Sequence, residues 1–353
     1  MKEERALDFN PIFKSIFEVP RASRYRLNTW LVIGALCASS WLSPVASGEE
    51  PLRIVTTLPE FAEMARELSG GEAGLRVEVE ALLRGNEDPH FVEALPSFVK
   101  RASRADLIVS AGLELENAWL SKVLAKSGHA QVQVGGPGYC ELGSAVEVLQ
   151  KPQGPITRAM GDVHASGNPH FYLSPLHLIS AGRRLGDCMA RLRPGSAQKI
   201  AAQVILFEKR MTSLHQDLLS KLATVVQSLG AGASVRFMEY HQDFTYLFAA
   251  YRLHSIGAIE EKPGVPPSAA RIAKAAQWAT AEGVRVALAA THHPASTMTK
   301  FSELSGVPHR RWPVMLQSGD VKLDRIEKLQ RFYIEQLIEV LKQSVTQPEV
   351  KGR

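Results

Sequence analysis

Three histidines stand in short loops whose residues suit the binding of a metal ion. The frame x-Pro-His-Phe occurs at residues 88–91, around His90, and again at 168–171, around His170, while His241 lies in the segment 240–244. Proline fixes the backbone just before each of the first two imidazoles, and the aromatic residue after them can exclude water. Three neutral imidazoles favour Zn²⁺, Cu²⁺ or Ni²⁺ over Mn²⁺ and Ca²⁺, which prefer more oxygen ligands.

The segments around these loops alternate between strand and helix patterns. Short apolar runs read as strands, and apolar residues at helical spacing read as helices. In the first half we expect strands at 52–57, 75–83, 106–111 and 131–135, helices at 61–68, 97–103 and 176–191, and a Gly- and Pro-rich loop at 136–160. Strand–helix units of roughly thirty residues predict a parallel sheet in an α/β domain.

Residues 196–229 carry apolar side chains at helical spacing with no glycine or proline. This pattern predicts one helix of roughly seven turns or more, long enough to join two domains rigidly. The alternation then restarts, with strands expected at 235–240, 255–259 and 284–290 and helices at 244–251, 268–281 and 323–342. The predicted fold class is α/β, with two (β/α) domains at 48–195 and 230–353, parallel sheets, and one long linking helix at 196–229.

The three histidines divide between these predicted domains. His90 and His170 belong to the first domain and His241 to the second. Open α/β sheets bind ligands at the carboxyl ends of their strands, where these loops lie. We therefore expect the metal site in the cleft between the domains.

The first fifty residues have the layout of a secretory signal peptide. Arg21, Arg24 and Arg26 precede an apolar stretch from Trp30 to Leu42, and small residues follow. We expect cleavage near Ser47, so that 1–47 is removed and the protein is exported to the periplasm. An uncleaved anchor is the alternative, and the long segment before Arg21 leaves the true start codon open.

The charge and the cysteines limit the other possibilities. The chain has 353 residues and a net charge of +5, without a basic run interleaved with aromatic residues, so nucleic-acid binding is not indicated. Cys140 and Cys188 remain after removal of the signal peptide. In an oxidising compartment they either pair or stay free, because sequence separation says nothing about their distance.

Several further segments form an ordered set. They are Asp88-Pro89-His90 with Pro96-Ser97, 105–109 leading to 112–116 and Trp119, the block 161–175, His241 with 243–246, and 263–268. In this order they resemble the periplasmic solute-binding proteins that serve ABC importers of zinc and manganese. The resemblance covers essentially the whole chain after the signal peptide.

The resemblance implies two (β/α) domains bridged by one helix and a protein that binds rather than catalyses. We expect capture of Zn²⁺, with Mn²⁺ or another divalent transition metal as the less favoured cargo. The partner would be an ABC permease in the membrane, with a periplasmic metallochaperone as a further candidate, and the protein itself would be a monomer. A zinc-dependent hydrolase using Asp243 or Glu239 as general base, and a metal-binding surface adhesin, are the alternatives.

The fourth ligand stays open at this point. The family completes its site with a carboxylate from the last third of the chain, but Thr291-His292-His293 and Arg310-Arg311 stand where it would be expected. His292 or His293 is the first candidate, a water the next, and Asp320 another. The two histidines could also be ordinary surface residues.

Three more residues are candidates for supporting roles. His164, six residues before His170, is either an accessory ligand or a solvated loop residue. Glu116 and Glu239 are expected to accept hydrogen bonds from the imidazole N–H groups, as the partners of metal-bound histidines usually do.

Overall fold

The computed structural model describes residues 50–71, 74–154, 164–228, 235–317 and 323–346. The predicted signal peptide and Asp320 lie outside these ranges. Residues 49–353 form one compact unit. Within the described ranges, no helix is both long and apolar enough to cross a bilayer.

The first sheet has four parallel strands in the order β2-β1-β3-β4. They are β1 (Leu52–Thr56), β2 (Val77–Ala81), β3 (Leu107–Ser110) and β4 (Tyr139–Glu141). The helices of this half are α1 (Pro59–Leu68), α2 (Pro96–Ala102), α3 (Leu120–Ser127) and α4 (Pro175–Leu192). β3 is buried along its whole length, as expected for a parallel strand covered on both faces.

The second sheet repeats this order as β6-β5-β7-β8, again with all strands parallel. Its strands are β5 (Arg236–Glu239), β6 (His254–Ala258), β7 (Val284–Ala290) and β8 (His309–Trp312). The helices are α6 (Thr245–Tyr251), α7 (Ala269–Ala281), α8 (Ala295–Ser305) and α9 (Ile326–Thr346). Two parallel sheets of the same order confirm the predicted fold class.

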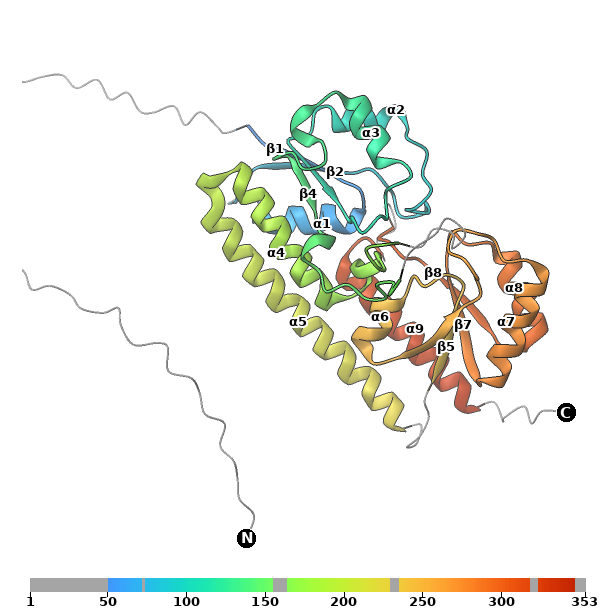
Figure 1. Cartoon of the computed structure of the whole chain (residues 1–353). Helices are drawn as coiled ribbons and strands as arrows, with labels where there is room; N and C mark the ends of the chain where they lie inside the picture. The colour runs from blue at the N-terminus through green and yellow to red at the C-terminus, as the bar shows by residue number, and fades with distance from the viewer. Residues whose placement is uncertain (1–49, 72–73, 155–163, 229–234, 318–322, 347–353) are drawn as a thin grey trace, which may run out of the picture. The chain divides into compact units, whose positions relative to one another are not determined.

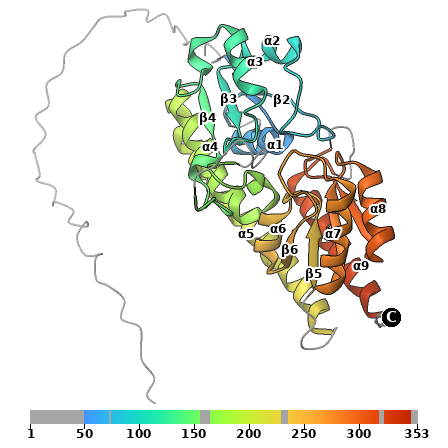
Figure 2. The same cartoon turned by 45° about the vertical axis from the view of Figure 1, so that its right-hand side comes forward.

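The predicted linking helix is α5 (Ala197–Ser228). Its 32 residues span about 48 Å, and it begins beside the first sheet and ends beside the second (Figure 1). α4 and α5 lie side by side in both views (Figures 1 and 2). Gly182 and Gly186 of α4 permit this approach, because a Cβ at either position would meet Phe207 or Val204 at 2.9 or 2.6 Å.

One hydrophobic core extends through both halves of the unit. Ile54 and Ile108 of the first sheet, Leu288 of the second, and Tyr333 of α9 belong to the same buried cluster. A smaller cluster packs α7 and α8 against the second sheet. The domain boundaries at 195/196 and 229/230 stay a prediction.

Two buried carboxyl groups of α1 contact the chain near its C-terminal helix. Glu60 Oε1 accepts a hydrogen bond from the Leu316 amide at 2.7 Å, and Glu63 Oε2 accepts one from the Ile326 amide at 2.6 Å. Burial raises the pKa of Glu60 to about 8. The first helix is thus bonded to backbone that follows β8.

The prediction of a strand at 131–135 is wrong, and the predicted loop at 136–160 contains one short strand, while its residues 155–160 lie outside the described ranges. Residues Ala130–Val132 form a 3-10 turn, and Gln133 Nε2 donates to the carbonyls of Leu124 and His129, closing the end of α3. The edge strand is β4 instead, where the buried Cys140 pairs with Val109 of β3.

The open question about the cysteines is settled in favour of a pair. Cys140 of β4 and Cys188 of α4 form a disulfide, with their Cα atoms 6.1 Å apart. Both residues are fully buried. The bond fastens α4 to the edge of the first sheet.

Candidate metal-binding site

His90 is held by its own loop, which follows β2. Asp88 Oδ1 accepts from the His90 amide and lies 3.0 Å from His90 Nδ1. Burial would raise the pKa of Asp88, but the hydrogen bond and charge of His90 outweigh it and lower it to about 2. An ionised acceptor at Nδ1 keeps the ring proton there and leaves the Nε2 lone pair free for a metal.

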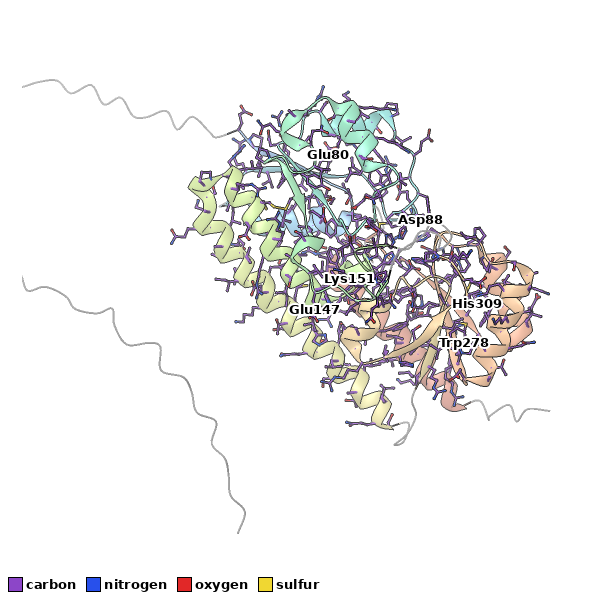
Figure 3. All side chains as sticks on the ribbon, in the orientation of Figure 1. Glu80, Asp88, Glu147, Lys151, Trp278 and His309 are labelled. Carbon is purple, nitrogen blue, oxygen red and sulfur yellow. A yellow bond between two sulfur atoms is a disulfide. The ribbon has the colours of Figure 1, made fainter. Side chains whose placement is uncertain are left out.

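The same loop is anchored from behind by Trp119, whose Nε1 donates to the Pro89 carbonyl at 2.9 Å. Asp88 lies where the loops of the first sheet meet those of the second (Figure 3). The Asp-Pro-His frame therefore fixes both the backbone and the ring of His90.

His170 begins a 3-10 turn (His170–Leu173) and is fully buried. Its amide donates to Asn168 Oδ1 at 2.9 Å, and its Nδ1 lies 3.1 Å from the Tyr172 hydroxyl. Burial lowers the pKa of His170 well below its usual value, so the ring is neutral.

The His170 loop is tied to the second half of the chain through Asn168 and Tyr246 of α6. Asn168 Nδ2 donates to the Gln242 carbonyl at 2.8 Å, beside His241. The Tyr246 hydroxyl donates to the Asn168 carbonyl at 2.8 Å and accepts from the Leu149 amide at 3.0 Å. These bonds hold the loop of His170 beside the loop of His241.

His241 follows β5 and has a carboxylate partner from the neighbouring strand. Its Nδ1 lies 3.0 Å from Glu260 Oε2, just after β6. Burial alone would lower the pKa of His241, but the hydrogen bond to Glu260 and the charge of Asp243 raise it to about 9. Glu260 fixes the ring with Nε2 turned away from it.

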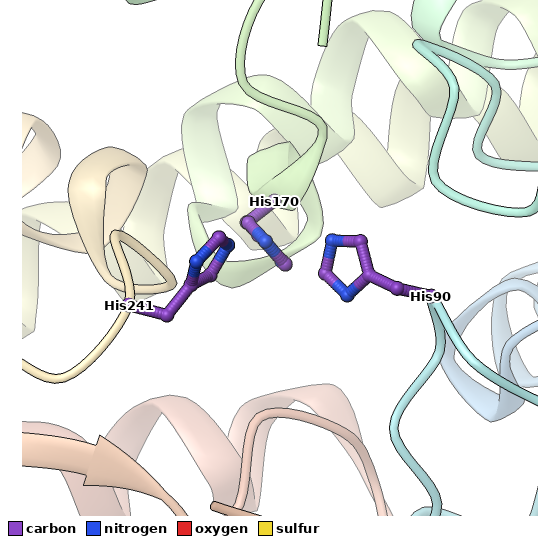
Figure 4. Close-up of side chains that lie close together, drawn as sticks. All are labelled: His90, His170 and His241. Carbon is purple, nitrogen blue, oxygen red and sulfur yellow. The ribbon is translucent and has the colours of Figure 1, made fainter. Parts of the chain in front are cut away.

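The structure brings the three predicted histidines together. One ring nitrogen from each of His90, His170 and His241 lies within 4.8 Å of the others, and the rings converge from three separate loops (Figure 4). His90 Nε2 and His170 Nε2 are buried without a hydrogen-bond partner. Three nitrogens on a tetrahedral zinc lie about 3.4 Å apart, so modest ring movements would complete the geometry.

Asp243 brings a carboxylate to this cluster. Its Oδ1 is buried, has no hydrogen-bond partner, and lies 3.8 Å from His170 Nε2. Burial would raise the pKa of Asp243, but His293 and His241 hold it far below its usual range. From the sequence Asp243 is expected only as a general base, although its position two residues after His241 was a signal for a ligand.

His292 and His293 form a second group with Asp243, whose ligand atoms also lie within 4.8 Å of one another. His293 Nε2 lies 3.0 Å from Asp243 Oδ2. His292 Nε2 is buried without a partner, and burial lowers the pKa of His292 to about 4. The two histidines are therefore part of the site region and not ordinary surface residues.

His164 packs against the cluster but stands outside both ligand groups. Its ring stacks on that of His90 with the centroids 5.2 Å apart and the planes inclined by 29°, and both of its ring nitrogens are buried without partners. Burial lowers the pKa of His164 to about 3, so the ring is neutral. The prediction of a solvated loop histidine is thus wrong, and an accessory ligand stays a prediction.

The expected roles of Glu116 and Glu239 are wrong. Glu116 accepts hydrogen bonds from the Thr57 hydroxyl and from the Ala111 and Gly112 amides, holding a turn after β3. Glu239 Oε2 accepts from the Phe244 amide at 2.8 Å. The partners of the imidazole Nδ1 atoms are Asp88, Tyr172 and Glu260 instead. Asp88 stands inside the first histidine frame and could have been found there.

A pocket of about 170 Å³ opens onto both ligand groups. It is lined by His90 and His241 of the first group, by His292 and His293 of the second, and by Glu260. A larger pocket, of about 810 Å³, lies along α1 and is lined by no histidine or cysteine. Among the described residues, the chemistry of metal binding is therefore concentrated at the smaller pocket.

A family model described as zinc-uptake complex component A, periplasmic (ZnuA), matches residues 54–346. The zinc-binding protein AdcA of Streptococcus pyogenes serotype M3 is 24% identical over 245 residues, which cover 67% of this chain and 45% of AdcA. The chain thus spans about half the length of the curated relatives it matches.

Solved structures agree with the fold. A crystal structure of ZnuA superposes with a TM-score of 0.65 at 20% identity, covering 83% of this chain and all of that one. The solute-binding protein FpvC of Pseudomonas aeruginosa, solved with Ni²⁺, gives a TM-score of 0.68 at 21% identity, covering 85% of this chain and all of FpvC. With TM-scores of 0.65 and 0.68, both likenesses support the same overall fold for this chain.

Proposed function

Because the chain belongs to the family of periplasmic zinc-uptake complex component A proteins, we propose that it is an exported solute-binding protein that captures Zn²⁺ and delivers it to an ABC importer. The observation that carries the proposal is the convergence of His90, His170 and His241, two of which turn a buried, unpartnered Nε2 into the cluster. The zinc-binding name of its relative AdcA supports the same cargo.

For the fourth ligand we propose Asp243. A buried carboxylate oxygen without a hydrogen-bond partner is costly, and a cation between it and the imidazoles would remove that cost. Three nitrogens and one oxygen suit tetrahedral Zn²⁺, whereas Mn²⁺ prefers a site richer in oxygen. Ni²⁺ and Cu²⁺ fit the same donors, so selectivity depends on geometry and supply.

The histidine partners prepare the site for capture. Asp88 and Glu260 hold Nδ1 of His90 and His241, which aims their Nε2 atoms at the ion and makes the rings better donors. His170 is neutral and fully buried, so its lone pair is available and shielded from water. The ion would bind between loops of both sheets and be released to a membrane permease.

Hydrolysis is not favoured by the residues that would serve as general base. A general base must be ionised near neutral pH and must still be basic enough to accept a proton there. Burial raises the pKa of Glu239 to about 8, so it is protonated at pH 7, and the pKa of Asp243 is held far too low. We therefore propose a binding protein and not an enzyme.

The cellular setting follows the same proposal. The signal peptide directs the chain to the periplasm with cleavage near Ser47, and the protein acts as a monomer on an ABC permease, with a periplasmic metallochaperone as a further candidate partner. An adhesin would use the same ligands without a permease. Zinc-dependent growth of a strain lacking the gene, under chelator, separates transport from adhesion.

The central test is the metal content of untagged, exported protein by mass spectrometry. We expect close to one tightly held zinc per chain, lost in His90→Ala and in His241→Ala. His254→Ala, at an exposed histidine on β6, is the matched control and should keep the zinc. If neither site substitution lowers tightly bound zinc, the proposed function is wrong.

A further inference from the structure

We propose that Asp243, His292 and His293 form a second metal-binding site, which shares the Asp243 carboxylate with the three-histidine site. The inference rests in part on the proposed function, because the shared carboxylate connects two sites only if the first one binds an ion. The cargo class is a divalent transition metal of the same kind as in the first site.

The two oxygens of Asp243 face different groups. Oδ1 lies 3.8 Å from His170 Nε2, and Oδ2 lies 3.0 Å from His293 Nε2. The side chain is fully buried, so its orientation is fixed. A carboxylate that presents one oxygen to each set of imidazoles is able to bridge two ions.

His292 supplies the second unpartnered group. Its Nε2 is buried and makes no hydrogen bond, and one of its ring nitrogens lies within 4.8 Å of the ligand atoms of Asp243 and His293. Buried polar atoms are normally paired, and an orphan aimed into a cluster of ligands marks a place for a cation. Together with His293 it provides two imidazoles, the donors that Zn²⁺ and its neighbours prefer.

The turn that carries both histidines is held in place. The His293 amide donates to the Ala290 carbonyl at the end of β7, and Arg311 of β8 donates to the carbonyls of Thr291 and His293. The His293 ring stacks on Tyr240 with the centroids 4.3 Å apart. The arginine thus binds the turn that presents the histidines.

Histidines of both groups line one pocket. His292 and His293 line the same pocket of about 170 Å³ as His90 and His241. Asp88 and Glu260 stand in the walls of that pocket and add negative charge to attract a cation. An ion held at Asp243, His292 and His293 would be next to the three-histidine site, which offers it more protein ligands.

The two sites should differ in strength. The second offers three ligands, so water completes its coordination, and two dications that share one carboxylate repel each other. We therefore expect a tight first ion and a weaker, exchangeable second one.

The experiment is an equilibrium dialysis of the untagged, exported protein against buffered free Zn²⁺, with metal per chain measured by mass spectrometry. We expect wild type to reach two ions in two separate steps. The double variant His292→Gln/His293→Gln should bind one ion, with the affinity of the tight step within about threefold of wild type. His254→Gln is the control and should keep both steps.

The single variant His292→Gln removes a ring whose Nε2 makes no hydrogen bond and leaves the hydrogen bonds of Arg311 to the turn in place. It should weaken the second step at least about tenfold. Thermal unfolding of the metal-free forms checks that each variant is folded.

Three results would overturn the second site, and the first two are saturation of wild type at one ion and binding of two ions by the double variant. A loss of the tight step in the double variant would do so as well, because it would make these histidines ligands of the first site. Each of these leaves the proposed function intact if His90→Ala abolishes tight binding. An unchanged tight step in His90→Ala would instead contradict the proposed function.

Discussion

The carboxylate of Asp243 faces the imidazole of His170 across 3.8 Å, with both side chains fully buried. Since burial keeps His170 neutral, this contact is not an ion pair in the metal-free protein. It places a negative oxygen beside a free lone pair, and a metal cation bound between the two would be stabilised by both.

Asp243→Asn should therefore weaken zinc binding by more than the loss of one hydrogen bond would. The amide keeps the shape but loses the charge, and we expect a loss of about 10- to 100-fold or more in affinity. Competition with a zinc chelator measures it, and Asp187→Asn on the exposed face of α4 is the control. Unchanged affinity would exclude Asp243 as a ligand.

Asp88→Ala tests the support of His90. The substitution removes the acceptor for both Nδ1 and the backbone amide of His90, so we expect zinc affinity to fall by about 10- to 100-fold. Asp88→Asn retains an acceptor oxygen and should lose less. Equal losses in the two variants would mean that charge, and not orientation of the ring, is what Asp88 supplies.

Tyr246→Phe removes a hydroxyl that serves two backbone groups. The Leu149 amide and the Asn168 carbonyl would lose their partner, which should lower the free energy of unfolding by about 1–3 kcal/mol. Denaturant titration of the metal-free protein measures this. Zinc affinity should fall as well, since Asn168 positions the amide of His170; stability loss with no change in affinity would separate the two effects.

Replacement of the disulfide by Cys140→Ser/Cys188→Ser should lower the free energy of unfolding. The cross-link closes a loop with a sequence separation of 48 residues, for which about 2–4 kcal/mol is expected. Unfolding of the oxidised wild type and of the double variant gives the difference. Wild type treated with a reductant should match the variant, and a stability equal to that of oxidised wild type would contradict the prediction.

Glu60 predicts a pH dependence of stability. Its pKa is raised by burial to about 8 from the ordinary 4.5, so the fold prefers the protonated form. The contribution of Glu60 is complete below pH 4.5 and is lost as the pH rises through 8, at up to about 1.4 kcal/mol per pH unit. Glu60→Gln stays neutral and should remove this part of the slope, leaving the part due to the other carboxyls with raised pKa values, which are Glu63, Glu67, Glu116 and Glu239. Denaturant titrations of both proteins at pH 5 and 8 compare the slopes.

Much of this arrangement could be predicted from the sequence, because periodicity and local frames carry it. The alternation of strands and helices predicted both parallel sheets, and the repeated x-Pro-His-Phe frame indicated His90 and His170 as ligands. Each frame fixes its own backbone, so its geometry needs little from the rest of the fold.

The remaining features depend on contacts between distant segments. Asp243 lies near a predicted ligand in sequence, but only the turn after β5 decides that it points to His170 and not to solvent. The position of Glu260 beside His241 depends on the pairing of β5 with β6. The strand β4 consists of only three residues, and it is recognised by its pairing with β3. Short edge strands have too few residues to show a period.

The hydrogen bonds from Glu60 and Glu63 of α1 to Leu316 and Ile326 have a mechanical consequence. They fasten the chain that leaves β8 to the first helix of the other half. The two halves are therefore connected at this place as well as through α5. A rotation that opens the histidine loops must break these buried bonds or pivot about them. The release of an ion to a permease would then depend on α1, although this helix is far in sequence from every ligand in the C-terminal half.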